Sequence, residues 1–270
     1  MPGVTRAAFA GLPAYIGECR YNSSYDVLVS IAKQISRSLG LLDLACGDGH
    51  LLRLLAKGGH AGSMTGVDIS GGDLEIARSV LPSEVLLLQE RAQALSLKSG
   101  SVDVVLSHMA LMLFDDIETV LSEIRRVLIP GGTLAALVGR SFLTGAPNIV
   151  FQEIFRPFAK THLSTLRIGD RRTRSVEGWR ELLQKGFGDC QFEDVDVPWC
   201  PTPVELWEAL TQTYDIDRLS PQACQQLRAQ LMPAWEPLQD AQGRLSTGWG
   251  LRLVCARASE VAVNDLAATA

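Results

Sequence analysis

An acid and two glycines near the start of the chain have the spacing of a ligand-binding turn. The stretch LLDLACGDGH places Asp43 in an apolar run that leads to Gly47 and Gly49, and the leucine-rich segment LLRLLAKGG follows directly. A glycine turn between a buried strand and a helix lets a ligand come close to the backbone, and the free amides at the helix start favour a carboxylate or phosphate. The spacing therefore predicts a ligand at this turn.

Two common nucleotide-binding motifs do not fit the turn. The dinucleotide fingerprint G-x-G-x-x-G, counted from Gly47, has Leu52 in place of the third glycine, and counted from Ala45 it ends on His50. A phosphate loop that ends in Gly-Lys-Ser/Thr is missing as well. A methionine carboxylate is therefore a better candidate for this turn than a pyrophosphate.

A second acid stands at the end of the next expected strand. Asp68, in MTGVDIS, lies 19 residues beyond Gly49, and a carboxylate there can accept hydrogen bonds from both hydroxyls of a ribose. Taken alone, an aspartate at a strand end is more often a helix cap or a solvated turn residue. Together with the glycine turn at this spacing, ribose binding becomes the better interpretation.

Two histidines are candidates for a catalytic base. His108 follows the fourth expected strand, whose end should face the ligand crevice, and a free histidine titrates near pH 6.5. The alternative is that His108 only lines the pocket or binds a backbone carbonyl. His162 lies in a later insertion from which it could reach an acceptor, whereas His50 and His60 are expected to be structural or solvated.

The composition excludes several functions. Of 270 residues, 47% are hydrophobic, 20% are charged, and the net charge is -5, so the chain lacks the basic face that nucleic acids require. No window is apolar enough to span a membrane and the start lacks a secretory signal, so we expect a cytoplasmic protein without a membrane partner. Six scattered cysteines without ligand spacing predict reduced, mostly buried thiols and no metal site.

Alternating apolar runs and helical patterns between residues 41 and 139 predict a parallel sheet covered by helices. In DDIETVLSEIRRVLIPGG the apolar residues recur at i, i+3, i+4 and i+7, which predicts a helix packed on the sheet. Asp115 or Asp116 should cap this helix, and the Pro-Gly-Gly at 130–132 should end it. The expected strands cover residues 41–45, 64–68, 84–88, 102–107 and 133–138.

The pattern loosens after residue 139 but shows no repeat and no linker, which favours one domain with helical insertions over two domains. Thr202, Pro203 and Glu205 have the spacing of a capping box, and Ser220 followed by Pro221 repeats its first two signals. Expected helices lie near 147–160, 176–185, 203–213 and 221–232, with strands at 191–197 and in GWGLRLVCAR.

Four motifs in this order resemble those of class I S-adenosylmethionine-dependent methyltransferases, in particular the small-molecule branch related to quinone and natural-product methyltransferases. The turn is similar to the first motif, GVDIS to the ribose motif, SVDVVLSHMALMLFDD to the fourth-strand motif and EIRRVLIPGGTL to the segment before the fifth strand. The resemblance spans about residues 41–139. It implies an α/β fold with a Rossmann-like, seven-stranded, mostly parallel sheet, helices on both faces and a helical cap over the active site.

The resemblance also implies which residues hold S-adenosylmethionine. Its methionine end would lie over the glycine turn, Asp68 would hold the ribose, and Ser107 would lie beside the sulfonium. Ile69 would pack on the adenine face, and the backbone amide of Ala92 would meet the ring. The candidate set is Asp43, Ala45, Gly47, Gly49, Asp68, Ile69, Arg91, Ala92, Ser107 and Tyr25.

Two residues depart from the family pattern. Ala45 replaces the first glycine, which is tolerated wherever φ stays negative. Arg91 stands where the family usually has an acid that accepts a hydrogen bond from the adenine amino group, and a guanidinium is a donor only. Either Gln93 or Glu90 substitutes for that acid, or Arg91 points away and only Ala92 reads the ring.

Substrate choice should reside in residues 1–35 and 140–245, which in this family commonly close over the acceptor. The three tyrosines between residues 15 and 25 should bring at least one ring near the cofactor from a lid helix. Met109, Met112 and Phe114 indicate either an apolar acceptor pocket or plain core. Eight basic against three acidic residues between 156 and 185 indicate either an anionic acceptor or a solvated face.

We therefore expect a methyltransferase that acts on an oxygen or nitrogen of a small organic acceptor, anionic or aromatic, in specialised metabolism. It should be a monomer or homodimer without a nucleic acid partner. The alternatives are methylation of a ring carbon or a peptide, or a cofactor-binding partner protein without transfer activity. The expected single domain over 1–270 divides into lid helices at 1–40, a cofactor core at 41–139, a substrate cap with one core strand at 140–245, the last strand at 246–258 and a frayed tail at 259–270.

Overall fold

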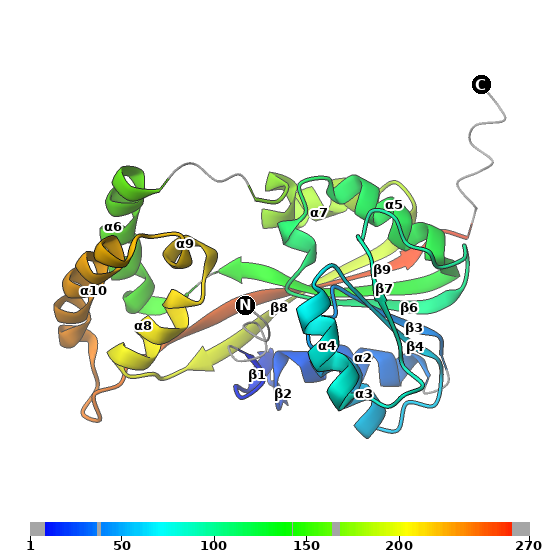
Figure 1. The fold of residues 1–270 in the computed structure, drawn as a ribbon, viewed down its shortest axis with the longest axis horizontal. Coiled ribbons are helices and arrows are strands. Elements are labelled where there is room, and N and C mark those ends of the chain that lie inside the picture. The colour runs from blue at the N-terminus through cyan, green and yellow to red at the C-terminus, as the bar shows by residue number, and fades with distance from the viewer. Residues whose placement is uncertain (1–8, 37–38, 142, 164–167, 261–270) are drawn as a thin grey trace.

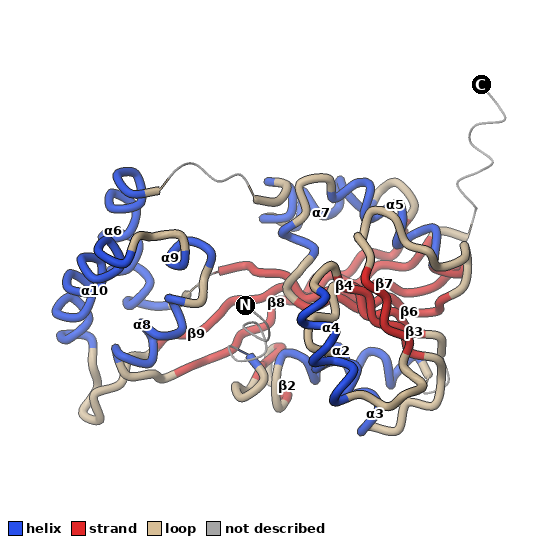
Figure 2. Tube along the Cα trace, in the orientation of Figure 1, coloured by secondary structure: helices blue, strands red, loops and turns tan. Residues whose placement is uncertain are grey.

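A sheet of nine strands runs through the molecule in the spatial order β2-β1-β8-β9-β7-β6-β3-β4-β5. The computed structural model describes residues 9–36, 39–141, 143–163 and 168–260, and Figure 2 shows its strands in red with helices around them. The strands are β1 (Ala14–Ile16), β2 (Cys19–Tyr21), β3 (Leu41–Leu44), β4 (Met64–Asp68), β5 (Leu86–Gln89), β6 (Val102–His108), β7 (Leu128–Ser141), β8 (Phe187–Trp199) and β9 (Thr247–Ala258).

The sheet corrects the expectation of seven strands that are mostly parallel. Strands β7, β6, β3, β4 and β5 pair in parallel, whereas β7–β9, β9–β8, β8–β1 and β1–β2 are antiparallel, so each kind contributes four pairings. The added strands β1 and β2 form a hairpin in the segment that was expected to hold only lid helices. Each is three residues long, too short for an alternating pattern to be recognised in the sequence.

Helices cover both faces of the parallel half of the sheet (Figure 1). On one face α2, α3 and α4 bury side chains such as Leu28 and Leu52, and on the other α5 and α7 bury Val120 and Trp179. Because both faces are covered, β3 is buried at every residue, including its acid. These helices are α2 (Ser24–Ile35), α3 (His50–Lys57), α4 (Gly71–Val80), α5 (Ile117–Val127) and α7 (Val176–Leu183).

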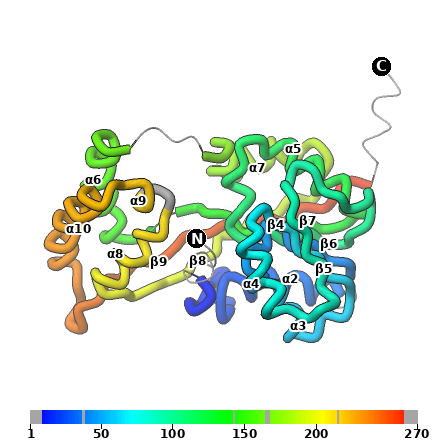
Figure 3. The backbone as a smooth tube through the Cα atoms, in the orientation of Figure 1, coloured from blue at the N-terminus to red at the C-terminus, as the bar shows by residue number. Residues whose placement is uncertain are grey.

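Four further helices form a group, called here the helical cluster, at the far end of β8 and β9. Figure 3 shows it at the opposite end of the molecule from α3, and β7 points towards it in Figure 1. Its buried side chains belong to the same apolar cluster as those under α2 and α3. The cluster comprises α6 (Gly145–His162), α8 (Pro203–Thr211), α9 (Tyr214–Asp217) and α10 (Pro221–Trp235), and single turns of 3-10 helix lie at η1 (Leu111–Leu113), η2 (Arg171–Arg174) and η3 (Glu236–Leu238).

Local signals at the helix ends are confirmed in part. The capping box of α8 is present, with the Thr202 hydroxyl accepting from Glu205 N at 3.2 Å, and Ser220 caps α10. Asp116 occupies the cap position of α5 but its side chain makes no capping hydrogen bond. The Pro-Gly-Gly at 130–132 does not end α5 either, because the chain turns extended at Leu128 and β7 runs through it.

The cysteines and membrane propensity can be compared with the sequence. All six thiols are free, but Cys46 alone is fully buried while Cys19 and Cys200 are exposed, so the expectation of mostly buried thiols is wrong. Within the described ranges no three potential ligand side chains gather around a metal position. None of the described helices combines the length and apolarity needed to cross a bilayer.

Candidate active site

The glycine turn closes the carboxyl end of β3 with a run of left-handed residues. Gly47 has φ 53° and Gly49, the cap position of α3, has φ 77°. A side chain at Gly49 would lie 2.8 Å from the Leu81 side chain, so glycine is required there by space as well as by φ. Ala45 has φ 60°, which contradicts the expected negative φ and places a methyl group in a region that costs L residues about 1–2 kcal/mol.

Asp68 ties the glycine turn to the neighbouring strand. Its Oδ2 accepts from the amide of Gly47 at 2.8 Å, and its Oδ1 accepts from the amide of Ser70 at 2.8 Å. Ser70 in turn caps α4 by accepting from Asp73 N. Because β3 and β4 are parallel neighbours, their carboxyl ends meet at one edge of the sheet, and a single carboxylate organises both turns there.

A cavity of about 480 Å³ opens beside this edge. It contains the candidate residues Ala45, Asp68, Ile69, Arg91 and Ala92, drawn from three successive strand ends, so the structure brings together half of the expected cofactor set. Ile69 is 65% exposed at the cavity and therefore offers a free apolar face. The complete lining is Leu44, Ala45, Val67, Asp68, Ile69, Glu90, Arg91, Ala92, Gln93, Leu113, Phe114, Asp115 and Asp116.

Asp43 is a buried acid without a counter-charge in the described part of the chain. It is 2% exposed, and its Oδ2 has no hydrogen-bond partner among the described residues. Burial, and then the negative charge of Asp68, raise the pKa of Asp43 to about 8. A carboxyl group held in this way is suited to a cationic ligand, which would supply the missing charge.

Ser107 has a structural contact at the edge between two strands. Its side chain is fully buried, and its hydroxyl donates to the carbonyl of Leu44 at 3.0 Å. The hydroxyl thus holds the end of β6 against the end of β3, immediately below the glycine turn. Ser107 is not among the residues that line the cavity.

His108 is enclosed by aromatic rings and by α2. The Tyr25 ring stacks on it with centroids 3.8 Å apart, the Phe9 ring meets it edge-on at 5.6 Å, and the Ser24 hydroxyl lies 2.8 Å from its Nε2. Burial, and then His50, lower the pKa of His108 to about 3. Titration near pH 6.5, on which its candidacy as a base depends, is therefore not what this environment provides.

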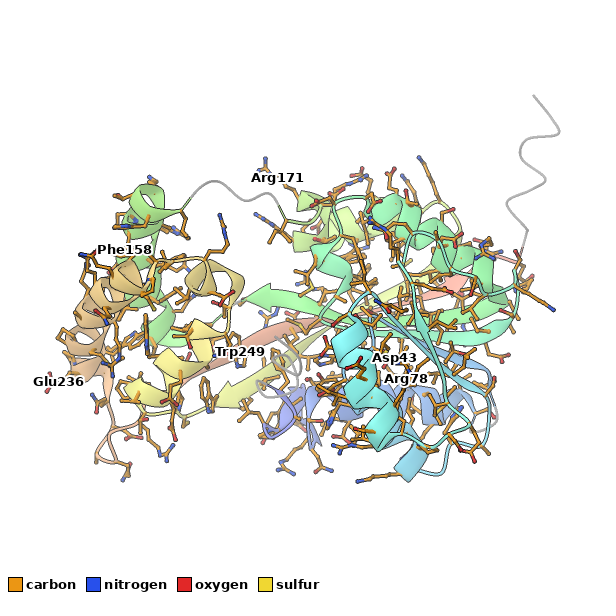
Figure 4. All side chains as sticks on the ribbon, in the orientation of Figure 1. Asp43, Arg78, Phe158, Arg171, Glu236 and Trp249 are labelled. Atoms are coloured by element: carbon orange, nitrogen blue, oxygen red, sulfur yellow. The ribbon has the colours of Figure 1, made fainter. Side chains whose placement is uncertain are left out.

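The remaining candidates on the acceptor side are separated. Tyr15 and Tyr21 lie in β1 and β2 rather than in a lid helix, so Tyr25 is the tyrosine that a helix brings to the strand ends. His162 is exposed at the end of α6 and stacks on Phe158 at 4.2 Å. Figure 4 labels Phe158 in the helical cluster, far from Asp43, so the structure does not bring His162 to the cavity.

Four lining residues were not assigned to the cofactor from the sequence. Leu113 and Phe114 add apolar surface opposite Ile69, and Asp115 and Asp116 add carboxylates. The sequence did show an acid pair directly after the fourth-strand motif, but that pair has the same appearance as a helix cap. The difference depends on where the side chains point.

Comparisons with known proteins agree with this geometry. Residues 42–136 match a family described as methyltransferase domain. The chain is 40% identical over 159 residues to the demethylmenaquinone methyltransferase of Lactococcus lactis, covering 57% of this chain and 61% of that protein. It is 32% identical over 125 residues to the malonyl-[acyl-carrier protein] O-methyltransferase of Methylococcus capsulatus, covering 41% and 46%. The chain thus spans less than two thirds of these curated relatives.

The fold is shared with solved structures. The YcgJ protein of Bacillus subtilis aligns with a TM-score of 0.57 and 19% identity over 88% of this chain and 99% of that one. Residues 42–136 therefore form a methyltransferase domain of the class I type, whose cofactor is S-adenosylmethionine. The residues present fit this cofactor, because the unpartnered oxygen of Asp43 and the acidic lining of the cavity suit a ligand with sulfonium and ammonium charges.

Proposed function

We propose that the protein transfers a methyl group from S-adenosylmethionine to an oxygen or nitrogen of a small organic acceptor. The observation that carries this proposal is the glycine turn tied by Gly47 to Asp68 at the mouth of a 480 Å³ cavity. Ligands of open α/β sheets bind in such a crevice outside the carboxyl ends of parallel strands. The acceptor would approach from the side of β6 and α2, where His108 and Tyr25 lie.

The protein's task in this reaction is alignment. The cofactor supplies a methyl carbon that is already activated for displacement, so the chain has to hold that carbon in line with the attacking atom, which can contribute about 7–11 kcal/mol. Asp68 would orient the ribose, and the Gly47–Gly49 amides would receive the methionine carboxylate. Ser107 would keep the two strand ends below them in register through its bond to Leu44.

We propose that His108 lines the acceptor position as a neutral ring and does not act as a general base. A base with a pKa of about 3 holds almost no proton affinity at neutral pH. Suitable acceptors are then neutral amines, or hydroxyl groups acidic enough to arrive ionised. His108→Gln should change kcat only a few-fold and leave its pH profile unaltered, and a loss of 10²-fold or more with a lost limb of that profile would restore the base.

We further propose that α2 and the helical cluster cover the acceptor and select it, in a pathway of specialised metabolism. The position of the cluster beyond the end of β7 supports this role. In the basic stretch, Arg172 is already paired with Asp170, Glu118 and Glu181 at 2.7–3.1 Å, so it adds little to any attraction for an anionic acceptor. Exposed basic side chains that could do so are Arg156, Lys160, Arg171 and Arg174.

Titration calorimetry with S-adenosylmethionine and with NAD tests the cofactor. Binding of the former and not the latter is expected, and no binding of S-adenosylmethionine would refute the proposal. Incubation with methyl-labelled cofactor and host extract, followed by mass spectrometry, tests the transfer. A labelled small molecule is expected. A labelled protein would overturn the acceptor class, and no labelled product beside intact cofactor binding would leave a binding protein without transfer activity.

A further inference from the structure

The adenine end of the cavity lacks its usual acid and has a different one on the opposite wall. Arg91, at the family's acid position after β5, is exposed and can only donate hydrogen bonds. Across the cavity, Asp115 and Asp116 at the start of α5 are part of the lining. An adenine amino group is a donor and requires an acceptor, so the partner for this group has to come from elsewhere in the lining.

The nearby acceptors differ in what they already bind. The Glu90 carboxylate accepts from the amide of Ser96 at 2.9 Å, and the Asp115 carboxylate accepts from the amide of Gly169 at 2.7 Å. Both acids therefore have structural partners that hold loops in place. Asp116 instead accepts from the side-chain amide of Gln93 at 2.8 Å, and Gln93 also lines the cavity.

The position of Asp116 makes this contact unusual. An aspartate at a helix cap position normally accepts from the first amides of its helix, which contributes about 1 kcal/mol. Asp116 occupies that position in α5 and makes no such bond. Its carboxylate is directed across the cavity to Gln93, which uses one oxygen, Oδ1, and leaves Oδ2 without a hydrogen bond to any described residue.

We propose that Asp116, oriented by Gln93, accepts the hydrogen bond from the adenine amino group of the cofactor and so replaces the acid that Arg91 displaces. This inference rests on S-adenosylmethionine being the cofactor in the proposed function. Asp116 is then a specificity-determining residue and Gln93 a positioning residue. The site distinguishes adenine from bases that carry a carbonyl oxygen at the same place, because that oxygen would meet a carboxylate with no proton between them.

The test compares S-adenosylhomocysteine with S-inosylhomocysteine, in which the amino group is replaced by a carbonyl oxygen. Calorimetry on the wild-type chain should show a preference of at least about tenfold for the adenine compound, since a buried hydrogen bond to a charged group contributes roughly that much. Asp116→Ala should reduce this preference to about twofold or less, mainly by weakening the adenine compound. Gln93→Leu should reduce it about threefold.

Asp115→Ala is the matched control, because it removes the same charge from the same cavity but from a carboxylate that serves Gly169. Its preference should equal that of the wild type. An equal loss in Asp115→Ala and Asp116→Ala, an unchanged preference in Asp116→Ala, or no preference in the wild type would each overturn the proposal. Failure of the wild type to bind either compound would instead refute the proposed cofactor. Thermal unfolding of each variant checks the fold, which should be little changed at Asp116 because no cap is lost.

Discussion

The two halves of the sheet use different physical means to build their sites. In the parallel half, short strands end in turns, and the cofactor candidates are backbone amides and carboxylates within a few residues of those ends, as in the pair Gly47 and Asp68. In the antiparallel half, β7, β8 and β9 are 12–14 residues long and carry the helical cluster far from the turns. A turn can bind a ligand through local chemistry, whereas the acceptor side depends on packing between distant segments.

The largest expected effect tests whether the helical cluster is separable from the cofactor site. Trp235 in α10 is fully buried and its Nε1 donates to the carbonyl of Pro147 in α6 at 3.2 Å. Trp235→Ala should lower the free energy of unfolding in urea by about 3–5 kcal/mol, because a large cavity and an unpaired carbonyl remain. Affinity for S-adenosylmethionine, measured below the unfolding transition, should stay unchanged. A parallel loss of affinity would show that the two halves are coupled.

The next effect concerns the carboxylate that joins two turns in the parallel half. Asp68→Ala removes acceptors for the Gly47 and Ser70 amides together with the proposed ribose contact. Calorimetry should show S-adenosylmethionine affinity weaker by about 1.5–3 kcal/mol. Asp103→Ala is a useful control, since Asp103 also binds a backbone amide, that of Gly40, but at the other end of the strands. Similar affinity losses in both variants would remove the special role of Asp68.

A third effect is the dependence of stability on pH through Asp43. The unfolded chain loses this proton near pH 3.8 and the folded chain keeps it until about pH 8. The folded state therefore binds one more proton between these values, and stability falls by up to about 1.4 kcal/mol per pH unit as pH rises. Asp43→Asn should remove this slope, so urea unfolding at pH 5, 6, 7 and 8 should show a stability gain that grows with pH. A gain independent of pH would contradict the raised pKa.

The smallest effect tests the strained residue of the glycine turn. Ala45→Gly relieves about 1–2 kcal/mol of left-handed strain but adds about 0.4–1 kcal/mol of unfolded-state entropy, so a net stabilisation of about 0.5 kcal/mol is expected. Ala56→Gly, in the middle of α3, should instead destabilise by about 1 kcal/mol. Chemical unfolding at matched conditions compares the two. Destabilisation in both variants would show that Ala45 is not strained.

The sequence predicted the elements of the parallel half well for a local reason. Each strand there is an apolar run covered on both faces, and each turn carries its own glycine or acid, so the signals lie within a few residues of the structure they specify. The hairpin β1–β2 gave no such signal because its strands are three residues long. The left-handed φ of Ala45 was also missed, since alanine rarely adopts it and glycine-rich context alone does not define φ.

The sequence by itself determined the class of domain, the glycine turn and the acid after the second core strand. Only the tertiary structure decided which side chains share the cavity, because that depends on contacts between residues far apart in the chain. It directs Asp116 to Gln93 rather than to its own helix, and it encloses His108 between Tyr25 and Ser24 so that its pKa falls to about 3. Burial and side-chain direction set these properties, and neither is encoded in spacing alone.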